Sequence, residues 1–155
     1  MDMMRRRAMM GAAGPEPDIP VTVTWSGSGA DKTSSKIDAT DRDLYMTIPF
    51  VEGDSRLQTT ATASTNAFIN RCAALYNDSG LTEFVGYYNS GTGKIVSSRP
   101  ATTFSPKYAF DREVKIVPRG YYAKLVICKN GTNAFSSNDK FIAYVNAHEV
   151  LVLRK

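Results

Sequence analysis

The sequence predicts a mainly β protein: a single antiparallel β-sandwich or jelly-roll domain with one short helix (about residues 66–76) and an extended N-terminal arm. Three observations lead to this prediction. The 155 residues are 43% hydrophobic and 22% charged, which is the ordinary range for one globular domain. Short alternating or β-branched apolar stretches recur along the chain with polar turns between them. The repeated helices that a βαβ architecture needs are missing from the pattern.

The clearest of these stretches is Tyr121–Lys129 (YYAKLVICK), followed by Asn130-Gly131. Residues on both of its alternating faces can be buried, and Lys124 is the only charge before the terminal Lys129. Asn-Gly supplies the backbone conformations of a tight hairpin turn. We therefore predict that this stretch is a central strand covered on both faces.

The chain divides into an arm with a Pro-rich linker (residues 1–19) and the β-sandwich domain (residues 20–155). The apolar part of the leader, Ala8–Gly14, is short and holds two glycines, so it fits a signal peptide poorly. Three prolines make Gly14–Pro20 a stiff extended linker. Methionines adapt to irregular partner surfaces and arginines pair with carboxylates, so the predicted partner-binding residues are Met3, Met4, Arg5, Arg6, Arg7, Met9 and Met10.

The domain begins with alternating residues 21–25, typical of a half-buried strand, and continues through a polar loop at Ser26–Ser35. A second alternating strand is predicted within Ile37–Phe50, and a turn with an edge strand within Val51–Ser64. The single helix is predicted at Asn66–Tyr76, where apolar residues recur at helical spacing after a capping Ser or Thr. A buried strand is the alternative for the same residues.

The later segments are short and closely spaced, and each has the pattern of a strand. Two of them flank a Gly-containing loop and predict a hairpin, and another stops at Pro118 before an Arg-Gly turn. The predicted strands are Thr82–Tyr88, Lys94–Ser97, Glu113–Val117, Tyr121–Lys129, Phe141–Val145 and Glu149–Leu153. Because strand order is invisible in a sequence, a sandwich and a barrel both remain open.

Composition excludes several classes of partner. The net charge of +4 is modest and no basic stripe is interleaved with aromatics, so we expect no nucleic-acid binding by the domain. No apolar run reaches 18 residues, so we expect no membrane-spanning helix. Cys72 and Cys128 lie in apolar surroundings, which predicts buried thiols, with a disulfide between them left open.

No pattern predicts catalysis, a cofactor or a metal, and we expect a non-enzymatic protein. Three carboxylates (Asp38, Asp41 and Asp43) could attract calcium, but Arg42 lies among them and a solvated turn is the favoured interpretation. The single histidine, His148, has no nucleophile motif to serve, and adjacent strand positions would turn it away from Glu149.

Aromatic residues offer a candidate binding surface. Exposed aromatic faces suit the apolar side of a sugar ring, whereas the alternative is that these side chains fill the core or a subunit contact. The residues in question are Trp25, Tyr87, Tyr88, Tyr108, Phe110, Tyr121 and Tyr122. Among them, the predicted glycan or partner contacts are Trp25, Tyr87, Tyr88 and Tyr122.

Two segments resemble parts of known virion proteins. The leader MMRRRAMM (Met3–Met10) resembles the Met/Arg-rich starts of small virion proteins from tailed phages of gut bacteria. VPRGYYAKL (Val117–Leu125) resembles a strand-turn-strand of phage sandwich domains. The resemblance implies a structural virion subunit: a head fibre, a capsid decoration protein or a tail component.

We therefore expect a homo-oligomeric virion protein that docks through its arm onto other virion proteins and copies of itself. The alternative is a carbohydrate-binding β-sandwich module on a cell surface or a virion, with a host surface glycan as its partner.

Overall fold

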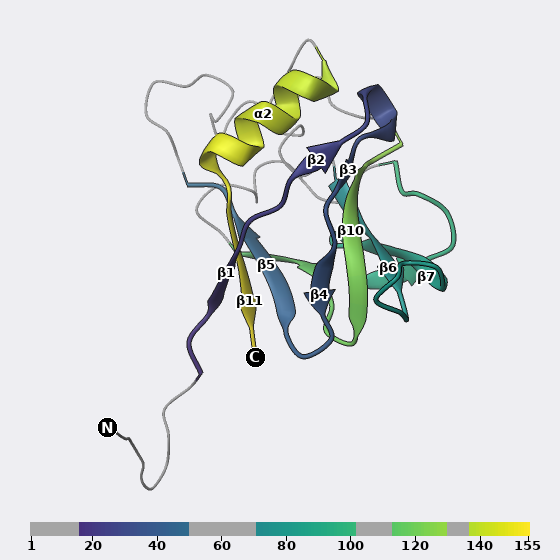
Figure 1. Cartoon of the computed structure of the whole chain (residues 1–155), viewed down its shortest axis with the longest axis vertical. Coiled ribbons are helices and arrows are strands. Elements are labelled where there is room, and N and C mark those ends of the chain that lie inside the picture. Colours follow the sequence, from purple (N-terminus) through teal and green to yellow (C-terminus); the bar gives the residue numbers. More distant parts are fainter. Residues whose placement is uncertain (1–15, 50–70, 102–112, 130–136) are drawn as a thin grey trace, which may run out of the picture.

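A computed structural model describes residues 16–49, 71–101, 113–129 and 137–155. It confirms a mainly β fold in which two antiparallel sheets are arranged as a sandwich, with one α-helix among the described residues (Figure 1). The leader residues, the Val51–Ser64 segment, the Asn130-Gly131 turn, Tyr108 and Phe110 lie outside the described residues.

The smaller sheet has four antiparallel strands, and the N-terminal strand β1 lies at its edge. Among the described strands β1 pairs only with β11, which ends at Arg154. The order across the sheet is β1 (Ile19–Val21), β11 (Val150–Arg154), β5 (Asp43–Thr47) and β9 (Val114–Val117).

The larger sheet has seven strands. Its main path runs through β2 (Trp25–Ser26), β3 (Thr33–Ser34), β10 (Tyr121–Ile127), β6 (Arg71–Tyr76), β7 (Phe84–Asn89) and β8 (Lys94–Val96), while β4 (Ile37–Ala39) also pairs with β10. A short 3₁₀ helix, η1 (Gly29–Asp31), connects β2 to β3, and the helix α2 (Asn138–His148) precedes β11.

Strand β10 is central, as the sequence predicts. It pairs with β6 on one side and with β3 and β4 on the other. Its residues Ala123, Leu125 and Ile127 are fully buried in the core between the sheets. Its opposite face contributes Val126, which packs with buried cysteines in a separate small cluster. Both faces are therefore covered along this half of the strand.

The core between the sheets follows the predicted alternation. Leu44, Met46 and Ile48 are fully buried, whereas Tyr45 and Thr47 between them are partly exposed. The β7–β8 hairpin and the strands β9 and β11 also form where alternation predicts them. Removing this apolar surface from water is the main stabilising contribution to such a fold.

The predicted position of the helix is wrong. Residues 71–76 form strand β6, and residues 66–70 lie outside the described part. Residues 71–75 are all buried, because β6 lies between β10 and β7 and both of its faces are covered. A short apolar run buried on both faces satisfies helical spacing by coincidence, so the strand alternative is correct.

The prediction of a strand at Phe141–Val145 is also wrong, because these residues belong to α2. Ser137 caps this helix: its Oγ accepts a hydrogen bond from the backbone N–H of Lys140 at 3.2 Å. Such caps satisfy a backbone donor that the first helical turn leaves open. Buried Ile142 and Val145 lie three residues apart on the face that meets the core.

The depth of the core at β10 yields a stability prediction. We expect Leu125→Ala to lower the free energy of unfolding by about 3 kcal/mol, because a fully buried leucine leaves a cavity. Ile95→Ala is the matched control, since Ile95 is 42% exposed and should cost less than about 1 kcal/mol. Denaturant unfolding measures both changes, and equal losses would contradict the placement of Leu125.

Candidate functional site

The first described residues, 16–18, are held against the domain by ion pairs. Asp18 accepts two hydrogen bonds from Arg154 at the end of β11, at 2.9 and 2.7 Å. Arg154 also binds Glu113 through two contacts of 2.6 Å. One guanidinium therefore joins the start of β1 to the segment that enters β9, across the whole four-stranded sheet.

A second group of charges holds Glu16 and Pro17. Arg42 donates to the Pro17 carbonyl at 3.0 Å and lies 3.8 Å from Glu16. Lys155 lies 3.6 Å from Glu16 and 3.0 Å from Asp41. We call residues 16–18 and these partners the arm root. The predicted linker residues thus contact the domain before β1 begins, so the chain enters the sheet along a fixed path.

The outer face of the larger sheet carries a row of aromatic side chains. Tyr122 of β10 lies directly opposite Tyr76 of β6, which in turn lies opposite Phe84 of β7. Phe84 meets Tyr76 and Tyr87 edge-on, with ring centroids 5.6 and 5.0 Å apart. We call Tyr122, Tyr76, Phe84 and Tyr87 the aromatic row. Phe84 is 47% exposed, so the row presents an open ring to solvent.

A β-bulge in β7 brings two of these rings to one face. The pairing register shifts between Leu75, opposite Gly86, and Tyr76, opposite Phe84. Bulges re-aim side chains in this way, and here Phe84 and Tyr87 share a face although they are three residues apart. Gly86 is required at the bulge, because a Cβ there would lie 2.8 Å from the Val96 carbonyl oxygen.

Lysine side chains lie among the rings. The Lys36 ammonium lies 5.8 Å from the ring centroid of Tyr122, and its Nζ donates to the Ser79 carbonyl and hydroxyl at 3.1 and 2.8 Å. The Lys124 ammonium lies 6.0 Å from the ring centroid of Tyr76. Lys36 is therefore held in place at one end of the row by contacts outside it.

The structure divides the four predicted contact aromatics between two faces. Trp25 and Tyr88 pack against the core between the sheets, and burial raises the pKa of the Tyr88 hydroxyl. Tyr87 and Tyr122 lie on the outer face. Sequence reasoning missed Tyr76 and Phe84, because Tyr76 was assigned to a helix and an exposed phenylalanine leaves no pattern. A strand interpretation of residues 71–76 would have put Tyr76 on the same face as Cys72 and Ala74, but its position opposite Tyr122 depends on the pairing of β6 with β10.

The two cysteines lie beside the aromatic row, on the same face of the larger sheet. Cys72 and Cys128 are buried with Ala74 and Val126, and Tyr76 and Tyr87 pack against this cluster. They are not joined in a disulfide. A hydrogen bond with Cys128 and burial both raise the pKa of the Cys72 thiol. Since the thiolate is the reactive form, this environment suits packing rather than nucleophilic chemistry.

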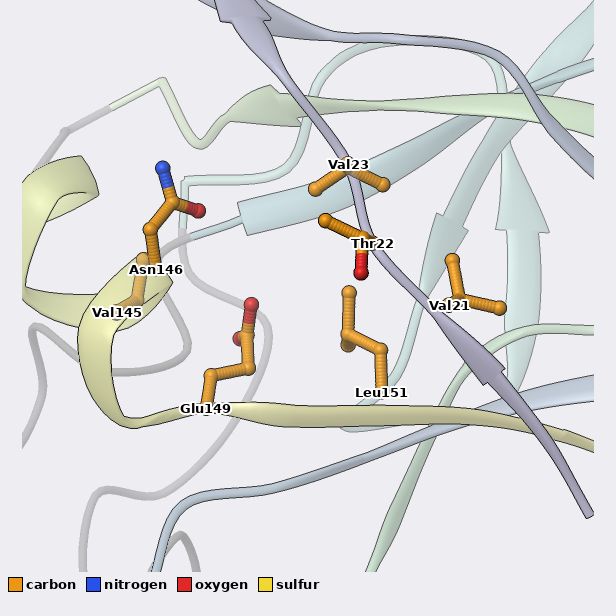
Figure 2. A pocket seen from close by; sticks show the side chains of 7 residues that line it. All are labelled: Val21, Thr22, Val23, Val145, Asn146, Glu149 and Leu151. Carbon is orange, nitrogen blue, oxygen red and sulfur yellow. The ribbon is translucent and has the colours of Figure 1, made fainter.

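A small cavity lies where the chain crosses from β1 to the larger sheet (Figure 2). Its volume is about 190 Å³, and its lining residues are Val21, Thr22, Val23, Val145, Asn146, Glu149 and Leu151. Glu149 forms an ion pair with Arg71, and each of the two side chains is only 3% exposed. Arg71 Nη2 also lies 3.0 Å from the sulfur of Met46 in the opposite sheet. The carboxylate is thus committed to a structural ion pair that joins the two sheets.

The three carboxylates considered as calcium ligands each contact a different partner. Asp38 accepts hydrogen bonds from Thr40, Asp41 pairs with Lys155, and Asp43 turns inward to Arg119 at 2.8 and 3.2 Å. Within the described ranges, no cluster of three His, Cys, Asp or Glu side chains could hold a metal ion.

His148 lies at the C-terminal end of α2. Its ring stacks on Tyr144 with centroids 4.2 Å apart, and its Nδ1 lies 2.9 Å from the Tyr144 carbonyl oxygen. The neighbouring Glu149 is paired with Arg71, so it does not orient the histidine ring.

Comparison with known proteins found no matching family model, no similar curated protein and no similar solved structure. The resemblance to phage virion proteins therefore stays a prediction. No helix in the described part of the chain is long and apolar enough to span a membrane.

The arm root yields a pH prediction. Hydrogen bonds from Arg154 lower the pKa of Asp18 below its usual 3.8 and that of Glu113 below its usual 4.5. A carboxyl group whose pKa is lower in the folded than in the unfolded state stabilises the folded state at pH values above the unfolded pKa. This stabilisation is lost as the pH falls through the folded pKa. In Arg154→Met, carboxyl ¹³C NMR titration should show both pKa values rising towards their usual values.

At pH 7 the thermal unfolding midpoint should be lower for Arg154→Met than for the wild type. This difference should shrink as the pH falls below 3.8, because the carboxylates become protonated. Lys140→Met, an exposed substitution on α2, is the control and should leave both carboxyl pKa values unchanged. Unshifted pKa values in Arg154→Met would contradict the arm-root geometry.

The buried ion pair yields a second stability prediction. We expect Glu149→Ala to lower the free energy of unfolding by about 3 kcal/mol or more, because it removes the carboxylate partner of a buried guanidinium. Arg71→Met/Glu149→Leu should cost less than Glu149→Ala alone, since no uncompensated charge remains. Denaturant unfolding measures both, and a larger loss in the double variant would contradict this account.

Proposed function

We propose that the protein is a non-enzymatic structural subunit of a phage virion, as a head fibre, capsid decoration protein or tail component. Its N-terminal arm docks onto neighbouring virion proteins and copies of itself. The leader carries the chemistry for this contact: Arg5, Arg6 and Arg7 can pair with carboxylates, and its methionines adapt to irregular apolar surfaces.

The arm root is the observation that carries the proposal. A subunit that is attached through a terminal arm must transmit that attachment to its folded domain. Asp18 and Glu16 contact cationic groups on β11, the C-terminal residue and the loop before β5. Single exposed ion pairs contribute little, but several charges in a network with bidentate geometry hold a segment more firmly.

The position of β1 supports the same conclusion. β1 is an edge strand with three residue pairs to β11, so the preceding chain leaves from the margin of the sandwich rather than from its middle. Because the arm continues directly from this strand, a partner that holds the arm also fixes the orientation of the four-stranded sheet. A flexible Gly/Ser-rich tether would leave the domain free to rotate.

Deletion of Met1–Gly14 tests the proposal. The truncated protein should remain folded, with an unfolding midpoint close to that of the full chain, because the deletion leaves the arm root and both sheets intact. It should fail to enter particles when it replaces the full chain during particle assembly. Quantitative mass spectrometry of purified particles measures incorporation.

Arg5→Ala/Arg6→Ala/Arg7→Ala should reduce incorporation as well, because the charge complementarity of the arm is lost. Lys94→Ala/Lys140→Ala, which removes exposed charges from the domain, is the control and should be incorporated normally. Normal incorporation of the truncated protein would overturn the proposal.

A further inference from the structure

We propose that the aromatic row binds an acidic glycan, with a sugar ring on Phe84 and a sugar carboxylate at Lys36 and Lys124. This inference goes beyond the arm-docking function and is independent of it. It gives the carbohydrate-binding alternative a defined site on the outer face of the larger sheet.

The aromatic side chains supply the apolar part of the site. One face of a pyranose ring presents C–H groups, which are attracted to the negative face of an aromatic ring. Phe84 is the most exposed ring of the row, at 47%, and exposed Val85 follows it in the bulge. Tyr76 and Tyr87 contact Phe84 edge-on at interplanar angles of 64° and 65°, so they hold its ring from two sides.

Three lysine side chains on this face can attract an anionic ligand. The register of the strands places Lys124 and Lys94 on the same face as the row, and Lys36 lies against Tyr122. Of the acids at this face, Asp38 lies opposite Tyr122 at the Lys36 end, and its pKa is lowered by hydrogen bonds from Thr40 and by the Lys36 charge, so it stays ionised. Asp78, after β6, is engaged by the backbone N–H groups of Thr82 and Glu83.

The arrangement also orients the ligand. Lys36 and Lys124 lie at the Tyr122 and Tyr76 side of the row, whereas Glu83 directly precedes Phe84. A glycan with one ring stacked on Phe84 would therefore extend a neighbouring, carboxylate-bearing ring away from Glu83 and towards the lysines. Lys36 is already held by Ser79, so little side-chain freedom is lost when it binds.

A sugar fits this surface better than a protein partner does. The centres of protein interfaces are depleted in lysine, because burying an ammonium group is costly. Here the ammonium groups of Lys36 and Lys124 lie 5.8 and 6.0 Å from ring centroids of the row. A glycan leaves such groups partly hydrated while it covers the rings, so both parts of the surface are used.

The experiment measures binding of the full chain to polygalacturonate, hyaluronan and polysialic acid by isothermal titration calorimetry. We expect at least one to bind, and its affinity should fall as sodium chloride rises from about 50 to about 300 mM, because salt screens exposed charges. Methyl esterification of the ligand carboxylates should weaken binding about tenfold, because the backbone is kept while the charges on the sugar are removed.

Two variants separate the parts of the site. Phe84→Ala should lower the affinity for the acidic and for the esterified ligand alike, by about tenfold, because both lose the stacking contact. Lys124→Gln should lower the affinity for the acidic ligand only. Ile95→Ala and Lys140→Gln are the matched controls, since Ile95 lies on the opposite face of the same sheet and Lys140 is on α2. Circular dichroism should show all four variants folded.

Each alternative outcome overturns the inference. It fails if none of the three acidic glycans binds, if the esterified ligand binds equally well, or if the controls lose as much affinity as Phe84→Ala. It also fails if Phe84→Ala abolishes a self-association of the full chain and changes no glycan affinity, since the face is then a protein contact. The proposed function fails separately, because deletion of Met1–Gly14 should block incorporation into particles and leave glycan binding unchanged.

Discussion

The pairing register of β10 is the constraint on which the rest of the structure depends. β10 is bonded along both edges, by six residue pairs to β6 and by further pairs to β3 and β4. Successive side chains of a strand point to opposite faces, so this register sends Leu125 into the core and Lys124 to the outer face. A slip by one residue would exchange the two faces. The core and the aromatic row are therefore two results of one alignment.

The ion pair between Arg71 and Glu149 fixes how the two sheets meet. Arg71 begins β6 in the larger sheet, and Glu149 lies between α2 and β11 in the smaller one. Burying two charges is costly, and their attraction offsets the cost only when they meet in good geometry. An ion pair of this kind disfavours other alignments of the sheets, because a shifted sheet would leave one charge buried alone. We therefore expect it to contribute to the specificity of the alignment more than to net stability.

The two candidate surfaces belong to different sheets. The arm root ties residues 16–18 to the ends of strands in the four-stranded sheet, through Arg154 and Arg42. The aromatic row lies on the outer face of the seven-stranded sheet, beside the cluster that contains Cys72 and Cys128. Attachment at one surface leaves the other accessible. This division is compatible with both proposals, attachment through the arm and glycan binding at the aromatic row.

The sequence by itself determined the β class, the central strand and much of the core, because alternation of apolar residues is a local property. Leu44, Met46 and Ile48 could be assigned to the interior for that reason. Local pattern could not distinguish helix from strand at residues 71–76 or 141–145, since short apolar runs satisfy both periods. At residues 71–76 the pairing of β6 with β10 and β7 decided for a strand. At residues 141–145 the helix begins after the cap at Ser137, a local signal that the spacing of apolar residues does not include.

Only the tertiary structure decided which distant residues meet. Asp18 and Arg154 are 136 positions apart, and Arg71 and Glu149 are 78 apart, so no local pattern connects them. The aromatic row combines residues of three strands and depends on a bulge in β7, which shifts Phe84 to the face of Tyr76 and Tyr87. The identity of each side chain was visible in the sequence. Its neighbours were set by strand order and register, which are properties of the whole fold.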